Sequence, residues 1–179
     1  MAITKVTSEV LDLTDAYAFT GAVTGAGGGL VLQVIKSQTG AVSSGTPTMP
    51  RDDTIPQNTE GVALAALDTA ITPTDTAHIL RIDVTINFAN SALGPFTVAL
   101  FQDSTASALF AAPRYNTDTD VSNNLHFQHY MTAGTTSATT FKIRAGMLNA
   151  GTTYFNGRSA GRDYGGVAFS SMMVTEINV

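Results

Sequence analysis

The sequence predicts an all-β protein: an antiparallel β-sandwich, jelly-roll-like, with an extended N-terminal arm. Apolar and polar residues alternate in short runs, as they do in strands that bury one face, and turn-forming residues separate these runs. Only 13% of the residues are charged, and Gly, Thr, Ala and Ser fill the stretches between apolar runs, which is typical of turn-rich β proteins. A length of 179 residues fits one domain with a short appendage.

The clearest predicted strand covers residues 80–88, where five apolar side chains alternate with four polar ones. A second strand, 96–102, follows a turn at 90–95, so the two are predicted to form a hairpin or to be Greek-key neighbours. Phe101 is expected to face the opposite surface of its sheet or a neighbouring subunit. The side chains predicted to face the core are Leu80, Ile82, Val84, Ile86, Phe88 and Val98.

Further strands are predicted between clusters of Gly, Pro, Asn and Asp, and about eight strands make a sandwich or jelly roll. They cover residues 30–35, 62–67, 125–132, 140–145, 152–156 and 167–177. Segment 61–67 alternatively begins a short helix, because Ala and Leu favour one. Residues 37–60 and 113–124 are predicted to be long polar loops.

Residues 1–29 are predicted to be an anchoring arm that ends in a glycine-rich hinge, and residues 30–179 to be the head domain. The glycine run at 25–29 precedes a strand and does not open a helix, so a hinge is favoured over a phosphate loop. Tyr17 and Phe19 alternate with small residues, a pattern that suits an extended segment pairing with the sheet edge of another chain. These two side chains are therefore predicted to anchor the protein.

Composition and charge argue against several classes of partner. The chain has no cysteine, so disulfides and thiolate zinc sites are excluded. A net charge of -5 argues against binding of nucleic acid, because such surfaces concentrate Lys and Arg. The sequence has no run of about 18 apolar residues and no signal peptide. We therefore expect the protein to be made in the cytoplasm and not to insert into a membrane.

No metal site, cofactor or catalytic residue is predicted. His126 and His129 are three apart in a predicted strand, so their side chains should point to opposite faces. The acidic loop residues do not match the spacing of a calcium loop and are interpreted as solvated charges; they are Asp52, Asp53, Asp118 and Asp120. Ser170 and Ser171 lack the Gly-x-Ser-x-Gly elbow of a nucleophile. We therefore expect a protein that is not an enzyme.

Four loop residues are candidates for surface binding, because exposed Tyr and Arg carry much of the contact energy at interfaces. They are Tyr115, Arg158, Arg162 and Tyr164. Their expected ligand is a host receptor, a glycan or a neighbouring capsid subunit. The alternative is that the two tyrosines merely cover loop edges.

Several stretches, taken in order, resemble a module common at the C-terminal ends of tail-fibre and other virion proteins of tailed bacteriophages. They lie at residues 30–34, 72–82, 101–104, 136–144 and 151–157, and the module closes with a strand like 167–177. The resemblance implies a jelly-roll-like head, usually trimeric, used for attachment or display and without a catalytic site. It departs from tail fibres at the N-terminus, where about thirty residues stand in place of an adaptor domain and shaft.

Three functional hypotheses follow. In the first, the protein is a capsid decoration, cement or head-fibre protein on the virion, and the arm grips the capsid lattice. In the second, it is a tail-fibre tip or receptor-binding protein that docks on another tail component. The third, a hydrolytic particle protein, lacks a β-helix repeat and a carboxylate pair. The first two imply a homo-oligomer, expected to be a trimer, with phage capsid or tail proteins as partners.

Overall fold

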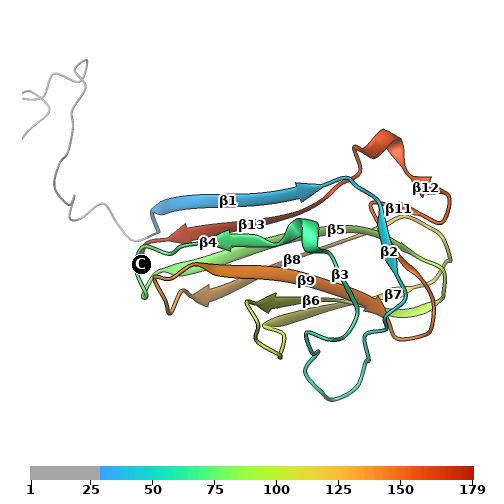
Figure 1. The fold of residues 1–179 in the computed structure, drawn as a ribbon, viewed down its shortest axis with the longest axis horizontal. Coiled ribbons are helices and arrows are strands. Elements are labelled where there is room, and N and C mark those ends of the chain that lie inside the picture. Colours follow the sequence, from blue (N-terminus) through green and yellow to red (C-terminus); the bar gives the residue numbers. More distant parts are fainter. Residues whose placement is uncertain (1–28) are drawn as a thin grey trace, which may run out of the picture.

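The computed structural model describes residues 29–179, which form two large antiparallel β-sheets packed face to face (Figure 1) and a small two-stranded sheet of β11 and β12. Two 3-10 helices, η1 (Ala65–Leu67) and η2 (Tyr164–Gly166), interrupt the strands. The strands are β1 (Val31–Thr39), β2 (Ser43–Gly45), β3 (Val62–Ala63), β4 (Thr69–Ile71), β5 (Ile79–Asn90), β6 (Gly94–Gln102), β7 (Phe110–Asn116), β8 (Asn123–Thr132), β9 (Thr139–Met147), β10 (Thr153–Phe155), β11 (Gly157–Arg158), β12 (Gly161–Arg162) and β13 (Ser170–Ile177).

The strand order is that of a jelly roll. In the first sheet β1, β13, β5 and β8 are neighbours, and β10 and β2 continue beside β5 beyond the end of β13. In the second sheet β3 and β4 pair with β9, followed by β6 and β7. Most successive long strands cross between the sheets, and β6 and β7 pair within the second sheet, as in two interlocked Greek keys. The predicted antiparallel sandwich is confirmed.

The core lies between the two sheets and contains the side chains predicted for it. All six predicted core residues are at most 1% exposed. The rings of Phe88 on β5 and Phe96 on β6 stack across the sandwich, with centroids 3.9 Å apart. Of the two alternatives predicted for these strands, the hairpin is wrong, because residues 91–93 carry the chain from one sheet to the other, as a Greek-key connection does.

The predicted loops contain strands whose sequences do not alternate. Strand β7 occupies the start of the predicted 113–124 loop and includes Pro113, which an edge strand tolerates because one side needs no hydrogen bond. The predicted 37–60 loop contains the end of β1 and the short β2. Segment 61–67 is part strand and part helix, since β3 is followed by η1.

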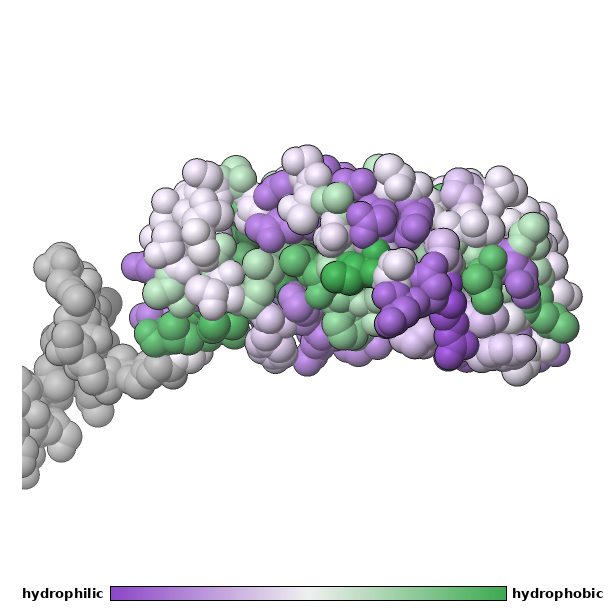
Figure 2. Space-filling model, turned by 90° about the horizontal axis from the view of Figure 1, so that it is seen from below, coloured by the Kyte–Doolittle hydropathy of each residue, from purple (hydrophilic) through white to green (hydrophobic). Residues whose placement is uncertain are grey.

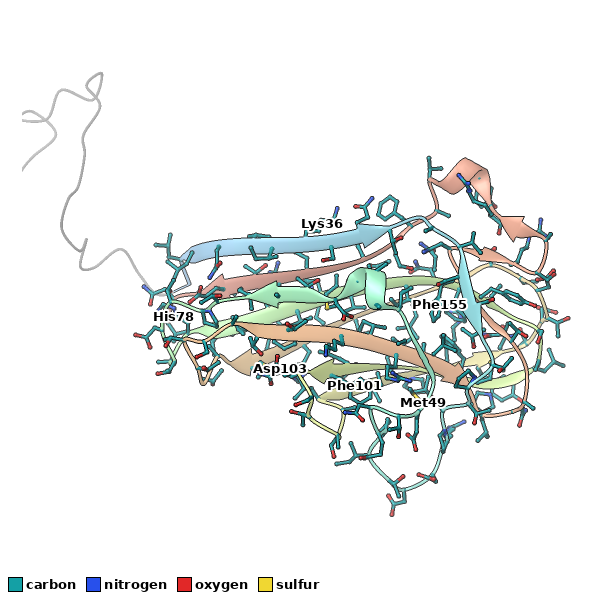
Figure 3. The ribbon with its side chains drawn as sticks, viewed as in Figure 1. Lys36, Met49, His78, Phe101, Asp103 and Phe155 are labelled. Atoms are coloured by element: carbon teal, nitrogen blue, oxygen red, sulfur yellow. The ribbon has the colours of Figure 1, made fainter. Side chains whose placement is uncertain are left out.

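A second, smaller core lies on the outer surface of the second sheet. Phe101 points away from the main core, as one of the two alternatives for it predicted, and contacts Met49 and Ala99. Met49 is fully buried and its backbone N–H donates to the carbonyl of Met147. Gly146 lets this loop approach, because a Cβ there would lie 2.9 Å from the carbonyl oxygen of Pro47. Segment 46–61 is therefore fixed to the outer face of the sheet at Met49 and Gly61, whereas residues 50–55 between them are exposed (Figure 3).

We expect Met49→Ala to lower the free energy of unfolding by about 2–5 kcal/mol, because it removes a fully buried side chain and leaves a cavity over Phe101. Met49→Leu is the matched control and should cost less than about 1.5 kcal/mol, since volume is nearly conserved. Urea unfolding followed by circular dichroism measures both. Equal stability of the Ala variant and the unchanged protein would show that segment 46–61 contributes no packing energy.

Candidate functional site

The sandwich has two distinct ends. The described chain begins at one of them, which we call the proximal end: the Gly29 N–H donates to the carbonyl of Asn178 at 2.7 Å, and the Asn178 N–H donates to that of Leu30 at 2.9 Å. The opposite, distal end carries β11, β12 and η2 (Figure 1). Tyr17 and Phe19, predicted to anchor the protein, lie outside the described residues.

Three of the four predicted binding residues come together at the distal end. Arg158, Arg162 and Tyr164 line a shallow hollow of about 480 Å³, which we call the distal hollow. Its other lining residues are Asp120, Val121, Ser122 and Asp163. The fourth predicted residue, Tyr115, is 63% exposed on β7 opposite Pro95 and does not line the hollow.

The charged groups of the distal hollow hold one another in place. The Asp163 carboxylate accepts hydrogen bonds from the Ser122 hydroxyl and from Nε of Arg158, at 2.9 Å for the latter. Both bonds, that of Ser122 foremost, lower the pKa of Asp163, and the bond to Asp163 raises the pKa of Arg158. The Asp120 carboxylate accepts two bonds from Ser159, which lower its pKa. The hollow thus presents opposite charges fixed by hydrogen bonds.

Tyr164 is held in a strained position and projects into solvent. Its φ is +48°, in the left-handed region that favours glycine, and the two glycines that follow also have positive φ. The side chain is 78% exposed, and Val167 beside it is 74% exposed. Strained, exposed side chains of this kind are concentrated at functional surfaces. The distal end can therefore offer an aromatic ring, an aliphatic side chain and guanidinium groups to a ligand.

The histidines and acidic loop residues do not assemble a metal site within residues 29–179, where no group of three potential ligands occurs. His126 faces outward and contacts the Thr85 hydroxyl at 3.1 Å, whereas His129 lies beside Phe110, and burial lowers its pKa. The prediction of opposite faces is confirmed. The Asp52 carboxylate accepts two hydrogen bonds from Thr54 within its own turn.

A buried carboxylate at the proximal end was not predicted from the sequence. Glu176 on β13 has no exposed side-chain surface and accepts four hydrogen bonds. The donors are Gln33 Nε2 at 2.5 Å, and the Thr74 N–H, the Thr74 hydroxyl and His78 Nδ1 at 2.7 Å each. Burial raises the pKa of Glu176, but these bonds outweigh burial and lower it to about 2. This proximal cluster ties β1, β13 and the 72–78 loop together near the start of β1 (Figure 3).

No helix in the described part of the chain is long and apolar enough to cross a membrane. A larger open hollow of about 620 Å³ shares Arg162 with the distal hollow, and other hollows lie elsewhere on the surface. One of about 280 Å³ lies over the second sheet and is lined by charged residues of both signs, among them Asp68, Asp103 and Lys142. Burial raises the pKa of Asp68 there.

No protein-family model matches the sequence, and no curated protein matches it. Among solved structures, the Eiger TNF of S. frugiperda is similar over 82% of this chain and 91% of that chain, with 12% identity and a TM-score of 0.48. A structure of infectious bursal disease virus, Gx strain, is similar over 82% of this chain and 32% of that one, with 12% identity and a TM-score of 0.41. Latent PorU of Porphyromonas gingivalis is similar over 86% of this chain and 14% of its own, with 11% identity and a TM-score of 0.38. The chain thus spans about a third of the virus chain, and likenesses this distant carry no inference about its function.

Proposed function

We propose that this chain is a non-enzymatic structural protein of a tailed-bacteriophage virion, a capsid decoration, cement or head-fibre protein made in the host cytoplasm and displayed on the particle. The resemblance of five ordered stretches to a virion module supports the setting. The observation that carries the proposal is the two-ended form of the sandwich. The N-terminal segment joins it at the proximal end, and the distal hollow lies at the other.

This arrangement supports a division of roles along the molecule. A segment that leaves the proximal end can follow a docking surface on the particle, and Tyr17 and Phe19 within it are the anchoring side chains. The distal hollow then points away from the particle and is free to meet a receptor, a glycan or a neighbouring subunit. The subunits form a closed oligomer, expected to be a trimer, whose mass light scattering gives directly.

We expect the double variant Tyr17→Ala/Phe19→Ala to bind particles on the order of a thousandfold more weakly, because two buried aromatic anchors of about 2 kcal/mol each contribute about 4 kcal/mol at an interface. The measurement is cosedimentation of the full-length protein with particles that lack it. Tyr164→Ala, an aromatic truncation at the distal end, is the matched control and should bind as the unchanged protein does. If Tyr164→Ala lost binding and the double variant kept it, the distal end and not the N-terminal segment would be the part that binds the particle.

The alternative is a tail-fibre tip or receptor-binding protein of the phage tail. The observation that favours it is the strained, exposed Tyr164 beside two arginines. Copy number per virion separates the two proposals, since hundreds of copies indicate the capsid and a few trimers indicate the tail. Release of soluble sugars from host envelope or capsule by the purified protein would instead support the third hypothesis, a hydrolytic particle protein.

A further inference from the structure

In the described part of the chain, strand β1 leaves one edge of the first sheet without a partner strand. Within residues 29–179 its backbone is bonded to β13 and, just before the strand, to Asn178, and to no other strand. The nine residues of β1 include one charged side chain, that of Lys36. A long strand edge with free N–H and C=O groups is a template for a further strand.

The side chains along the start of this edge are aliphatic and exposed. Leu30, Val31 and Val34 are 57%, 53% and 49% exposed, and Leu32 is 39% exposed. Figure 2 views the molecule from the face away from β1, where further apolar residues lie on the surface near the proximal end. The edge at β7 differs, because Pro113 and Arg114 stand within that strand and blunt it. The edge of β1 carries a bulge near Val31 and is regular from Gln33 to Thr39.

The segment that precedes β1 is suited to this edge in length, position and pattern. It ends at Gly29, next to the first exposed aliphatic residue. Residues 24–29 contain four glycines, which permit the chain to reverse direction. Residues 16–23 before them contain Tyr17, Phe19 and Val23 at alternate positions, with Gly21 between. A reversal within residues 24–29 would lay residues 16–23 antiparallel along the edge of β1.

We propose that in the free subunit residues 16–23 pair with the edge of β1 of the same chain and form an additional strand of the first sheet. A reversal centred between Ala26 and Gly27 places Phe19 opposite Val34 and Tyr17 opposite Lys36. Residues directly opposite in a ladder share a face, so Phe19 covers Val34. The Lys36 ammonium, which is 5.9 Å from the ring centroid of Phe169, gains a second aromatic neighbour in Tyr17.

The same chain is favoured over a neighbouring copy, because closing a six-residue loop costs little entropy compared with recruiting a second molecule. The pairing itself concerns the subunit away from any particle and does not rest on the proposed function, whereas its consequence for docking does. Where the particle offers a sheet edge to Tyr17 and Phe19, that edge competes with β1 for one segment. The apolar edge is thereby kept covered until docking.

Disulfide trapping in the full-length protein tests the pairing, and the absence of native cysteine makes the test clean. Opposite residues of an antiparallel pair have Cα atoms about 4.5–5.5 Å apart, within the range that a disulfide needs. In Phe19→Cys/Val34→Cys we expect mild oxidation to form a disulfide within one chain in most molecules. The matched control, Ala18→Cys/Val34→Cys, places the first thiol on the other face and should remain reduced.

Three results would overturn the inference. A disulfide between two chains, seen as doubled mass on a denaturing gel, would assign the edge of β1 to a neighbouring copy. Equal trapping in both variants would mean that residues 16–23 contact β1 without a fixed strand register. No trapping in either variant, with the thermal transition of the unchanged protein retained, would mean that residues 16–23 do not occupy this edge. Cosedimentation of Tyr17→Ala/Phe19→Ala with particles tests the anchoring role separately, because trapping is measured in their absence.

Discussion

Val84→Asp is expected to abolish cooperative folding. Val84 is fully buried in the middle of β5, where it lies opposite Met172 of β13 on one side and Phe127 of β8 on the other. A buried carboxylate without a partner costs several kcal/mol, which is comparable with the total stability of about 5–15 kcal/mol of a domain. Urea or thermal unfolding followed by circular dichroism should show no cooperative transition.

Val84→Ile is the control for this position, because it keeps the side chain apolar and β-branched and adds one methylene group. It should fold with a cooperative transition close to that of the unchanged protein. Soluble, cooperatively unfolding Val84→Asp protein would mean that the register of β5 is wrong, since a shift by one residue moves every side chain of a strand to the other face.

Strand β5 could be predicted because apolar and polar residues alternate in its sequence as buried and less buried positions alternate in the structure. One face meets the core and the other meets solvent or polar neighbours, so burial alternates together with polarity over residues 79–88. β7 was missed because it is an edge strand that contains Pro113 and Arg114, and its sequence does not alternate. The crossing from β5 to β6 was not readable either, since a short turn between two alternating strands looks like a hairpin.

The burial of Met49 could not be predicted from the sequence for a different reason. It stands alone in a polar segment between proline-containing stretches, which reads as an exposed loop. Its burial depends on Phe101, which faces the outer surface of its sheet, and on Gly146, where the absence of a side chain lets the loop approach. Each contact joins residues that are distant in the sequence, so no local pattern indicates them.

In the candidate sites, too, residues close in sequence could be predicted to lie together, and residues distant in sequence could not. Arg158, Arg162 and Tyr164 are close in sequence, so their gathering at one end follows from the short connections between β11, β12 and η2. Asp120 and Ser122 join them from a separate loop, which the sequence does not indicate. Glu176 and His78 are 98 residues apart, and a single glutamate in an apolar strand gives no signal of its partners.

The proximal cluster makes stability depend on pH. Glu176 has a pKa of about 2 in the folded chain against 4.5 for an ordinary glutamate, so its carboxylate form is stabilised by folding. That contribution is fully present above about pH 4.5 and is lost as the pH falls from about 4.5 to about 2. A lowering of this size corresponds to about 3 kcal/mol, since each pKa unit is worth about 1.4 kcal/mol.

Glu176→Gln should therefore be less stable than the unchanged protein by about 3 kcal/mol at neutral pH, because an amide cannot accept all four hydrogen bonds. Towards pH 2 the two curves should converge, since the native carboxyl is then becoming protonated. Urea unfolding at a series of pH values from 7 to 2 measures the difference. Asp53→Asn, which neutralises an exposed loop carboxylate, is the control for the change in net charge and should follow the unchanged protein. Parallel curves for Glu176→Gln and the unchanged protein across this range would show that the carboxylate of Glu176 is not stabilised by folding.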